Sequence, residues 1–86
     1  MMIYMDRIDA ENAARQKCAE QPEKVFAAVW NLQIYQWIIV TPSQAKLMLD
    51  NGFATGSGID CWYKGYLVAL DDAVAMEKSD KEKIDA

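Results

Sequence analysis

Residues 6–20 carry apolar positions at the spacing of one helix face. Asp6 stands where a helix N-cap is favoured, and Asp9 would place a negative charge in the first turn. Pro22 restricts the residue before it and so ends the segment. We therefore expect a helix from Asp6 to about Glu20. Its inward face would carry small side chains for the most part: Ile8, Ala10, Ala13, Ala14 and Cys18.

The next apolar run supports two interpretations. Pro22 suits the first turn of a second helix, and the apolar positions from Phe26 to Val40 continue at helical spacing. However, β-branched and aromatic residues dominate residues 34–41, which is typical of a strand. Partners for a lone strand would have to come from residues 1–5 or 66–70. We favour the helix, and the strand near residues 33–40 stays open as the alternative.

The clearest local signals lie between Thr41 and Phe53. Thr41-Pro42-Ser43-Gln44 has the form of a capping box, with proline at the first helical position. Ala45, Met48 and Leu49 would form the buried stripe of this third helix. We expect Gly52 to end it at positive φ, with Phe53 packed back on the helix.

A flexible link of small residues, Ala54 to Gly58, precedes the last segment. Ser57 and Asp60 have the spacing of a capping pair, which predicts a final helix to about Lys78. Its apolar face would be Ile59, Tyr63, Tyr66, Leu70, Ala73 and Val74. Alternating charges predict a frayed tail over residues 79–86. Residues 1–86 thus form one domain, all-α with three to four short helices, or α+β if a minor β element forms near residues 33–40.

The chain is rich in large apolar side chains for its size. Of its 86 residues 52% are hydrophobic, and three are tryptophan. A small domain hides a limited fraction of its surface, so some aromatic side chains should stay exposed and mark a partner surface. The candidate partner-binding residues are Trp30, Trp37, Trp62, Tyr63 and Tyr66. We expect them to contact a protein partner or a second copy in a homodimer, through the segment around Trp30 and Trp37 or the one around Trp62 and Tyr66.

Charge and cysteine usage narrow the class of protein. The net charge is −4, and residues 71–86 hold six acids against three lysines. No cluster of Lys and Arg is present, so nucleic acid is not an expected partner. The longest apolar stretch, Trp37 to Val40, is too short to span a membrane. Because the start does not have the form of a signal peptide, we expect Cys18 and Cys61 to be free thiols in a cytoplasmic protein.

Catalytic and metal-binding chemistry is poorly represented. The chain contains no histidine, which removes the commonest general base and metal ligand, and two cysteines alone cannot complete a structural zinc site. Ser43-Gln44-Ala45-Lys46 matches the Ser-x-x-Lys pattern, but the motifs that accompany it in penicillin-recognising enzymes are missing. Gly52, Gly56 and Gly58 fit no phosphate-binding loop. We therefore expect no enzyme activity, no metal and no cofactor.

Two stretches resemble known families. Residues 41–67 resemble the excisionase-type winged-helix domain, with Thr41-Pro42-Ser43-Gln44-Ala45-Lys46-Leu47 as a helix and Trp62-Tyr63-Lys64-Gly65-Tyr66-Leu67 as the turn after a recognition helix. That resemblance implies a DNA-associated regulator, but residues 54–61 hold no Lys or Arg to touch DNA.

Residues 63–71, Tyr63-Lys64-Gly65-Tyr66-Leu67-Val68-Ala69-Leu70-Asp71, resemble a helical stretch of small phage and prophage accessory proteins. This resemblance implies inhibition of a host factor by surface contact. The favoured hypothesis is thus a non-catalytic protein-binding module, and the DNA-associated regulator is the alternative. Convergence of Lys17, Lys24, Lys46 and Lys64 on one face would favour that alternative.

Overall fold

Three helices flank one sheet in the computed structural model, which describes residues 3–85 and the side chains of residues 4–78. The helices are α1 (Arg7–Glu20), α2 (Pro42–Asp50) and α3 (Leu70–Asp85). The strands are β1 (Ile3–Tyr4), β2 (Val25–Asn31), β3 (Gln36–Val40), β4 (Ile59–Tyr63) and β5 (Tyr66–Val68), and a 3₁₀ turn, η1 (Gly56–Gly58), precedes β4. The all-α prediction is therefore wrong, and the fold is α+β.

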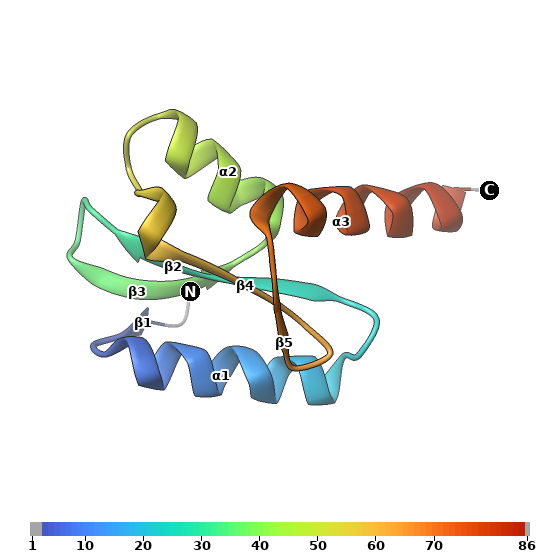
Figure 1. Cartoon of the computed structure of the whole chain (residues 1–86), viewed down its shortest axis with the longest axis horizontal. Coiled ribbons are helices and arrows are strands. Elements are labelled where there is room, and N and C mark those ends of the chain that lie inside the picture. Colours follow the sequence, from blue (N-terminus) through green and yellow to red (C-terminus); the bar gives the residue numbers. More distant parts are fainter. Residues whose placement is uncertain (1–2, 86) are drawn as a thin grey trace.

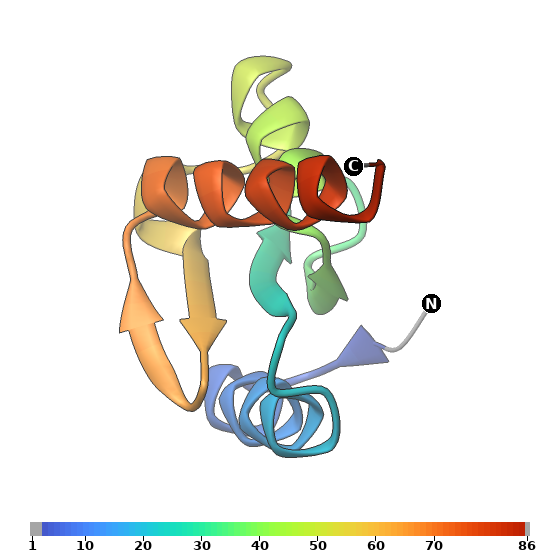
Figure 2. The same cartoon turned by 90° about the vertical axis from the view of Figure 1, so that its right-hand side faces the viewer.

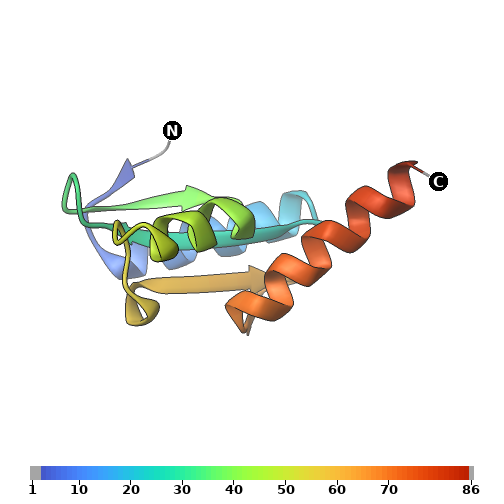
Figure 3. The same cartoon turned by 90° about the horizontal axis from the view of Figure 1, so that it is seen from above.

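The sheet is antiparallel throughout, in the order β1-β3-β2-β4-β5. Helix α1 covers one face, and α2 and α3 cover the other (Figure 1). Figure 3 shows α2 lying over the sheet and α3 running past its end. The two central strands, β2 and β3, are thus covered on both faces.

Because β2 and β3 are covered on both faces, their sequence was mistaken for a second helix, and that prediction is wrong. Residues in a strand buried on both faces are apolar at every position, so the alternation that marks a strand is absent. Phe26 and Trp30 are four residues apart, a spacing that places them on one face of a strand as well as on one side of a helix. The alternative strand is confirmed at Gln36–Val40. Residues 1–5 do supply one neighbour, β1, but the other neighbour is β2 rather than residues 66–70.

The predicted last helix is wrong over its first half. Residues 59–68 form the β4–β5 hairpin, and α3 begins only at Leu70. Lys64 and Gly65 occupy the two-residue turn, both at positive φ (53° and 84°), as tight hairpins require. Asp60 therefore caps no helix. Helix α3 continues to Asp85, through most of the segment for which we expected a frayed tail.

Helix α1 begins and ends where predicted, with Asp6 as the N-cap in extended conformation. Three of its expected inward residues, Ala10, Ala14 and Cys18, are buried. Ile8 is exposed instead. The small residues let the helix approach the sheet closely, and this leaves no room for a longer side chain on the contact line.

Helix α2 has the predicted capping box, because Thr41 and Gln44 each accept a hydrogen bond from the other's backbone N–H. Gly52 has φ 79°, and the amides of Gly52 and Phe53 donate to the carbonyls of Leu49 and Met48 (3.2 and 2.8 Å). These two bonds form the Schellman termination. The Phe53 side chain is 41% exposed and so is only partly covered.

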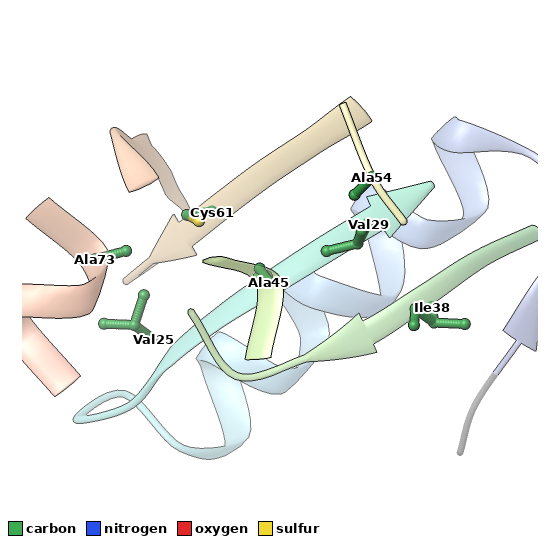
Figure 4. Close-up of a cluster of buried hydrophobic side chains, with 8 residues drawn as sticks. Val25, Val29, Ile38, Ala45, Ala54, Cys61 and Ala73 are labelled. Atoms are coloured by element: carbon green, nitrogen blue, oxygen red, sulfur yellow. The ribbon is translucent and has the colours of Figure 1, made fainter. Parts of the chain in front are cut away.

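The face under α2 and α3 holds the aliphatic core. Val25 and Val29 of β2 and Ile38 of β3 meet Ala45 of α2 and Ala73 of α3 (Figure 4). Ala54 and Cys61 complete the cluster. Burial of these side chains contributes roughly 1.5–3 kcal/mol for each valine or isoleucine.

Candidate interaction surfaces

The reactive and metal-ligating side chains that we considered in the sequence lie apart in the structure. Among the described residues no group of three or more metal-ligating side chains occurs. Cys18 lies on the inner face of α1, and Cys61 lies on the opposite face of the sheet, so the two thiols are free and separated. Burial, followed by the nearby Asp60 charge, raises the pKa of the Cys61 thiol to about 11, which keeps it unreactive at neutral pH.

The Ser-x-x-Lys residues are engaged in holding α2 against α3. Ser43 donates from its backbone N and its hydroxyl to Glu77 Oε2 (3.0 and 2.7 Å), so the carboxylate sits at the N-terminus of α2. Lys46 Nζ lies 3.9 Å from Asp71 Oδ1. The Ser43 hydroxyl thus donates to the Glu77 carboxylate and helps to join α2 to α3. A surface depression of about 270 Å³ after α1 is lined only by the exposed residues 21–24.

The five aromatic candidates are divided between the two faces of the sheet. Trp37 and Trp62 are buried beneath α1, where Arg7 and Arg15 lie 5.2 and 4.9 Å from their ring centroids. Trp30 is half-buried beside Trp37, with ring centroids 5.8 Å apart. The indole Nε1 of Trp62 is buried with no hydrogen-bond partner among the described residues.

The two tyrosines behave differently from the tryptophans. Tyr63 packs against the aliphatic core, and Tyr66 in β5 is 75% exposed. The structure therefore does not bring the five candidates together, and of the five only Tyr66 is strongly exposed among the described side chains.

A different apolar surface lies at the β2–β3 turn. It consists of Met5, Ile34, Tyr35 and Phe53, which we call the hairpin-end patch; all four are exposed, with Met5 at 72% and Tyr35 at 70%. Gln36 Nε2 donates to Met5 Sδ (3.5 Å), and Leu32 N donates to the Phe53 carbonyl (3.0 Å). These bonds place Met5 and Phe53 on either side of the loop that carries Ile34 and Tyr35. Figure 1 shows the three chain segments at the same end of the molecule.

The backbone beneath this patch is firmly held. Buried Asn31 accepts at Oδ1 from Gln33 N (2.8 Å), and its carbonyl accepts from Tyr35 N (2.8 Å). At the same end, Arg7 Nε and Nη2 donate to Asp60 Oδ2 and Oδ1 (2.9 and 2.8 Å). The hydrogen bond to Asp60 raises the pKa of Arg7, and the pair joins α1 to β4.

Sequence reasoning missed the hairpin-end patch because its members come from three separate segments. Ile34 was expected on the inner face of a helix, and Phe53 was expected to pack back on α2. The one available signal was Asn31, whose residue type is favoured at the start of a turn. A hairpin interpretation based on Asn31 would have placed residues 32–35 in a loop.

The lysines do not form a single basic face. Lys17 Nζ lies 5.9 Å from the Phe26 ring centroid on the α1 side, whereas Lys64 Nζ lies 5.4 Å from the Tyr63 ring centroid on the other side. Lys46 sits on α2 beside Asp71. Residues 41–67 contain α2, η1 and the β4–β5 hairpin, so the recognition helix that the winged-helix resemblance implies does not form between residues 54 and 61.

Comparison with known proteins adds no relative, since no family model, curated protein or solved structure matches the chain. None of the helices within residues 3–85 is long and apolar enough to cross a membrane.

Proposed function

We propose that this protein is a non-catalytic binding module that contacts another protein through the hairpin-end patch. The observation that carries the proposal is that four exposed apolar residues, Met5, Ile34, Tyr35 and Phe53, lie in three segments at the same end of the molecule (Figure 1). Grouped apolar side chains on a firmly held backbone are typical of protein-binding surfaces, where aromatic residues act as anchors.

The conformation of Tyr35 supports this assignment. Its φ is 53°, in the left-handed region that costs a residue with a Cβ roughly 1–2 kcal/mol relative to glycine. Its ring gains little burial in return, because the side chain is exposed. An aromatic residue held in a strained turn with its ring in solvent is better explained by contact with a partner than by the stability of the fold.

The chemistry of the surface favours a protein over a nucleic acid. Residues 31–36 and 51–58, which form the two loops of the patch, contain no Lys or Arg. Affinity for a phosphate backbone comes mainly from such cations. The proposal includes the hypothesis that the partner is a host factor blocked by contact. The resemblance behind this hypothesis covers residues 63–71, which form the end of β4, a turn, β5 and the start of α3 rather than one helix.

The test is affinity capture from a lysate of the protein's own host cells, followed by quantitative mass spectrometry. The test variant carries Tyr35→Lys and Phe53→Lys, and the control is Leu47→Lys, at an exposed leucine of α2. We expect proteins that the wild type and the control both enrich to fall at least about tenfold with the test variant. Recovery of the same proteins by all three chains would contradict the proposal.

A further inference from the structure

Strand β5 ends the sheet with an edge that no other described segment covers. It is the last strand in the order β1-β3-β2-β4-β5, and Figure 2 shows no described segment beyond it. Edge strands are commonly protected by short length, charged side chains, proline or a bulge. Strand β5 is short, with three residues, but Tyr66, Leu67 and Val68 include no charge or proline, and Tyr66 and Leu67 are 75% and 61% exposed.

The hairpin geometry fixes which backbone groups face outward. In a hairpin with a two-residue turn, the residues next to the turn form a hydrogen-bonded pair, and the pairs alternate along the ladder. Tyr63 and Tyr66 flank the turn, so the next pair, Trp62 with Leu67, is not hydrogen-bonded. The N–H and C=O of Leu67 therefore point away from β4, at the centre of the open edge.

A strand with one outward-facing residue at its centre is complementary to its own two-fold copy. With the axis beside Leu67, the N–H and C=O of Leu67 meet those of Leu67 in the second copy, and Tyr66 lies opposite Val68 of that copy. This antiparallel register covers both exposed apolar side chains of β5. A two-fold contact of this kind uses the same patch on both chains.

Charge complementarity favours the same register. Lys64 lies in the turn at one end of β5, and α3 begins at Leu70 just beyond the other end, so this register brings the turn of each copy towards the first turn of α3 of the other. Asp71 and Asp72 are in that turn, and the Asp71 side chain is 89% exposed. Each end of the contact thus sets a lysine against two carboxylates. An acidic partner strand would meet Lys64 but would gain nothing from Asp71 and Asp72.

We propose that β5 pairs antiparallel with β5 of a second copy, centred on Leu67, to form a two-fold dimer with a continuous sheet. The contact is small because β5 has three residues, so the dimer is weak and dissociates on dilution. It joins the molecules at the side of the sheet, away from the β2–β3 turn. Antiparallel pairing then holds the two hairpin-end patches at opposite ends of the dimer.

Sedimentation velocity on the full chain, from about 1 to 300 µM at low salt, tests the dimer. We expect the wild type and the Leu47→Lys control to shift from monomer to dimer across this range. Leu67→Pro removes the outward N–H without removing a bond to β4, and Leu67→Lys adds a charge at the axis. Both variants should stay monomeric at every concentration. A monomeric wild type, or a Leu67→Lys variant that dimerises like the wild type, would overturn the proposal.

A charge exchange tests the register separately from folding. Lys64→Glu, and Asp71→Lys with Asp72→Lys, should each raise the dimer dissociation constant about tenfold by placing like charges together. Combining all three substitutions should restore the dimer dissociation constant to within about threefold of the wild-type value. If the combined variant dimerises no more tightly than Lys64→Glu or the Asp71→Lys, Asp72→Lys variant, this register is excluded. Circular dichroism confirms that each variant is folded, and loss of dimer alone leaves partner capture by the hairpin-end patch intact.

Discussion

The β2–β3 and β4–β5 hairpins both expose large apolar side chains, yet they present different groups to a partner. Both strands of the first hairpin have neighbours within the sheet, so its turn offers side chains only. The second ends in the edge strand β5, so it offers main-chain groups as well. A side-chain surface selects partners by shape, whereas an open strand edge pairs with any strand of suitable register. The first hairpin is therefore suited to a foreign protein, and the second to a copy of the chain.

The largest expected effect concerns Cys61, which lies in β4, the first strand of the second hairpin. Its folded pKa of about 11 exceeds its ordinary value of 9.0, so the neutral thiol is favoured by folding. The resulting stability is complete below about pH 9 and is lost as the pH rises towards about 11, by up to about 2 kcal/mol. Denaturant unfolding of the wild type and Cys61→Ala at pH 8 to 11 measures the difference. Parallel pH profiles for the two chains would show that Cys61 does not contribute.

The first hairpin depends on the buried amide of Asn31. Asn31→Leu removes the acceptor for Gln33 N and should lower the free energy of unfolding by about 1–2 kcal/mol. Asn31→Asp keeps a side-chain oxygen at this position and should lose less. Urea titration provides the measurement. An Asn31→Leu variant as stable as the wild type would mean that this bond does not hold the loop.

The second hairpin depends on its turn. Gly65 has φ 84°, and nothing lies within 4 Å of the place where a Cβ would stand. Gly65→Ala should therefore lower the free energy of unfolding by about 1 kcal/mol, because alanine disfavours positive φ and not because of a steric clash. Gly52→Ala should cost about the same, and Gly56→Ala, at a glycine without positive φ, should change stability by less than about 0.5 kcal/mol. Thermal melts of the three variants measure this order of stability. Equal melting temperatures for all three would contradict the claim that Gly52 and Gly65 are required for their positive φ.

The smallest effect has the opposite sign. Asparagine tolerates the left-handed region better than tyrosine, so Tyr35→Asn should stabilise the protein by about 0.5 kcal/mol. The same variant should capture less partner, because it removes an anchor of the hairpin-end patch. Calorimetry and affinity capture on one sample test both halves. A variant that is less stable and still binds would show that Tyr35 serves the fold.

The elements that could be predicted from sequence are those with local signals. Thr41, Gln44 and Gly52 define α2 through bonds within a few residues. Asp6 and Pro22 mark the ends of α1 through local backbone conformation, without a side-chain capping bond. The hairpins carried weaker local signals, Asn31 before the first turn and Gly65 within the second. Tyr35 and Lys64 hold positive φ where Asn, Asp or Gly would have announced a turn.

The site was less predictable than the fold. Size and hydrophobicity identified the aromatic residues, but only the sheet pairing decides that Trp37 and Trp62 face α1 while Tyr66 faces solvent. Met5, Ile34 and Phe53 carry no sequence signal for a shared surface, because their proximity arises from pairing between distant segments.

Site-specific photo-cross-linking in cells tests the division of roles between the hairpins most directly. Benzoylphenylalanine would replace Tyr35, Tyr66 or, as the control, Leu47, all three exposed in the isolated chain. The account predicts that position 35 cross-links to a different protein, position 66 to a second copy of the chain, and position 47 to neither. If the variant with benzoylphenylalanine at position 35 gives no cross-linked product, or only the products that the position 47 control gives, the hairpin-end patch is not the binding surface.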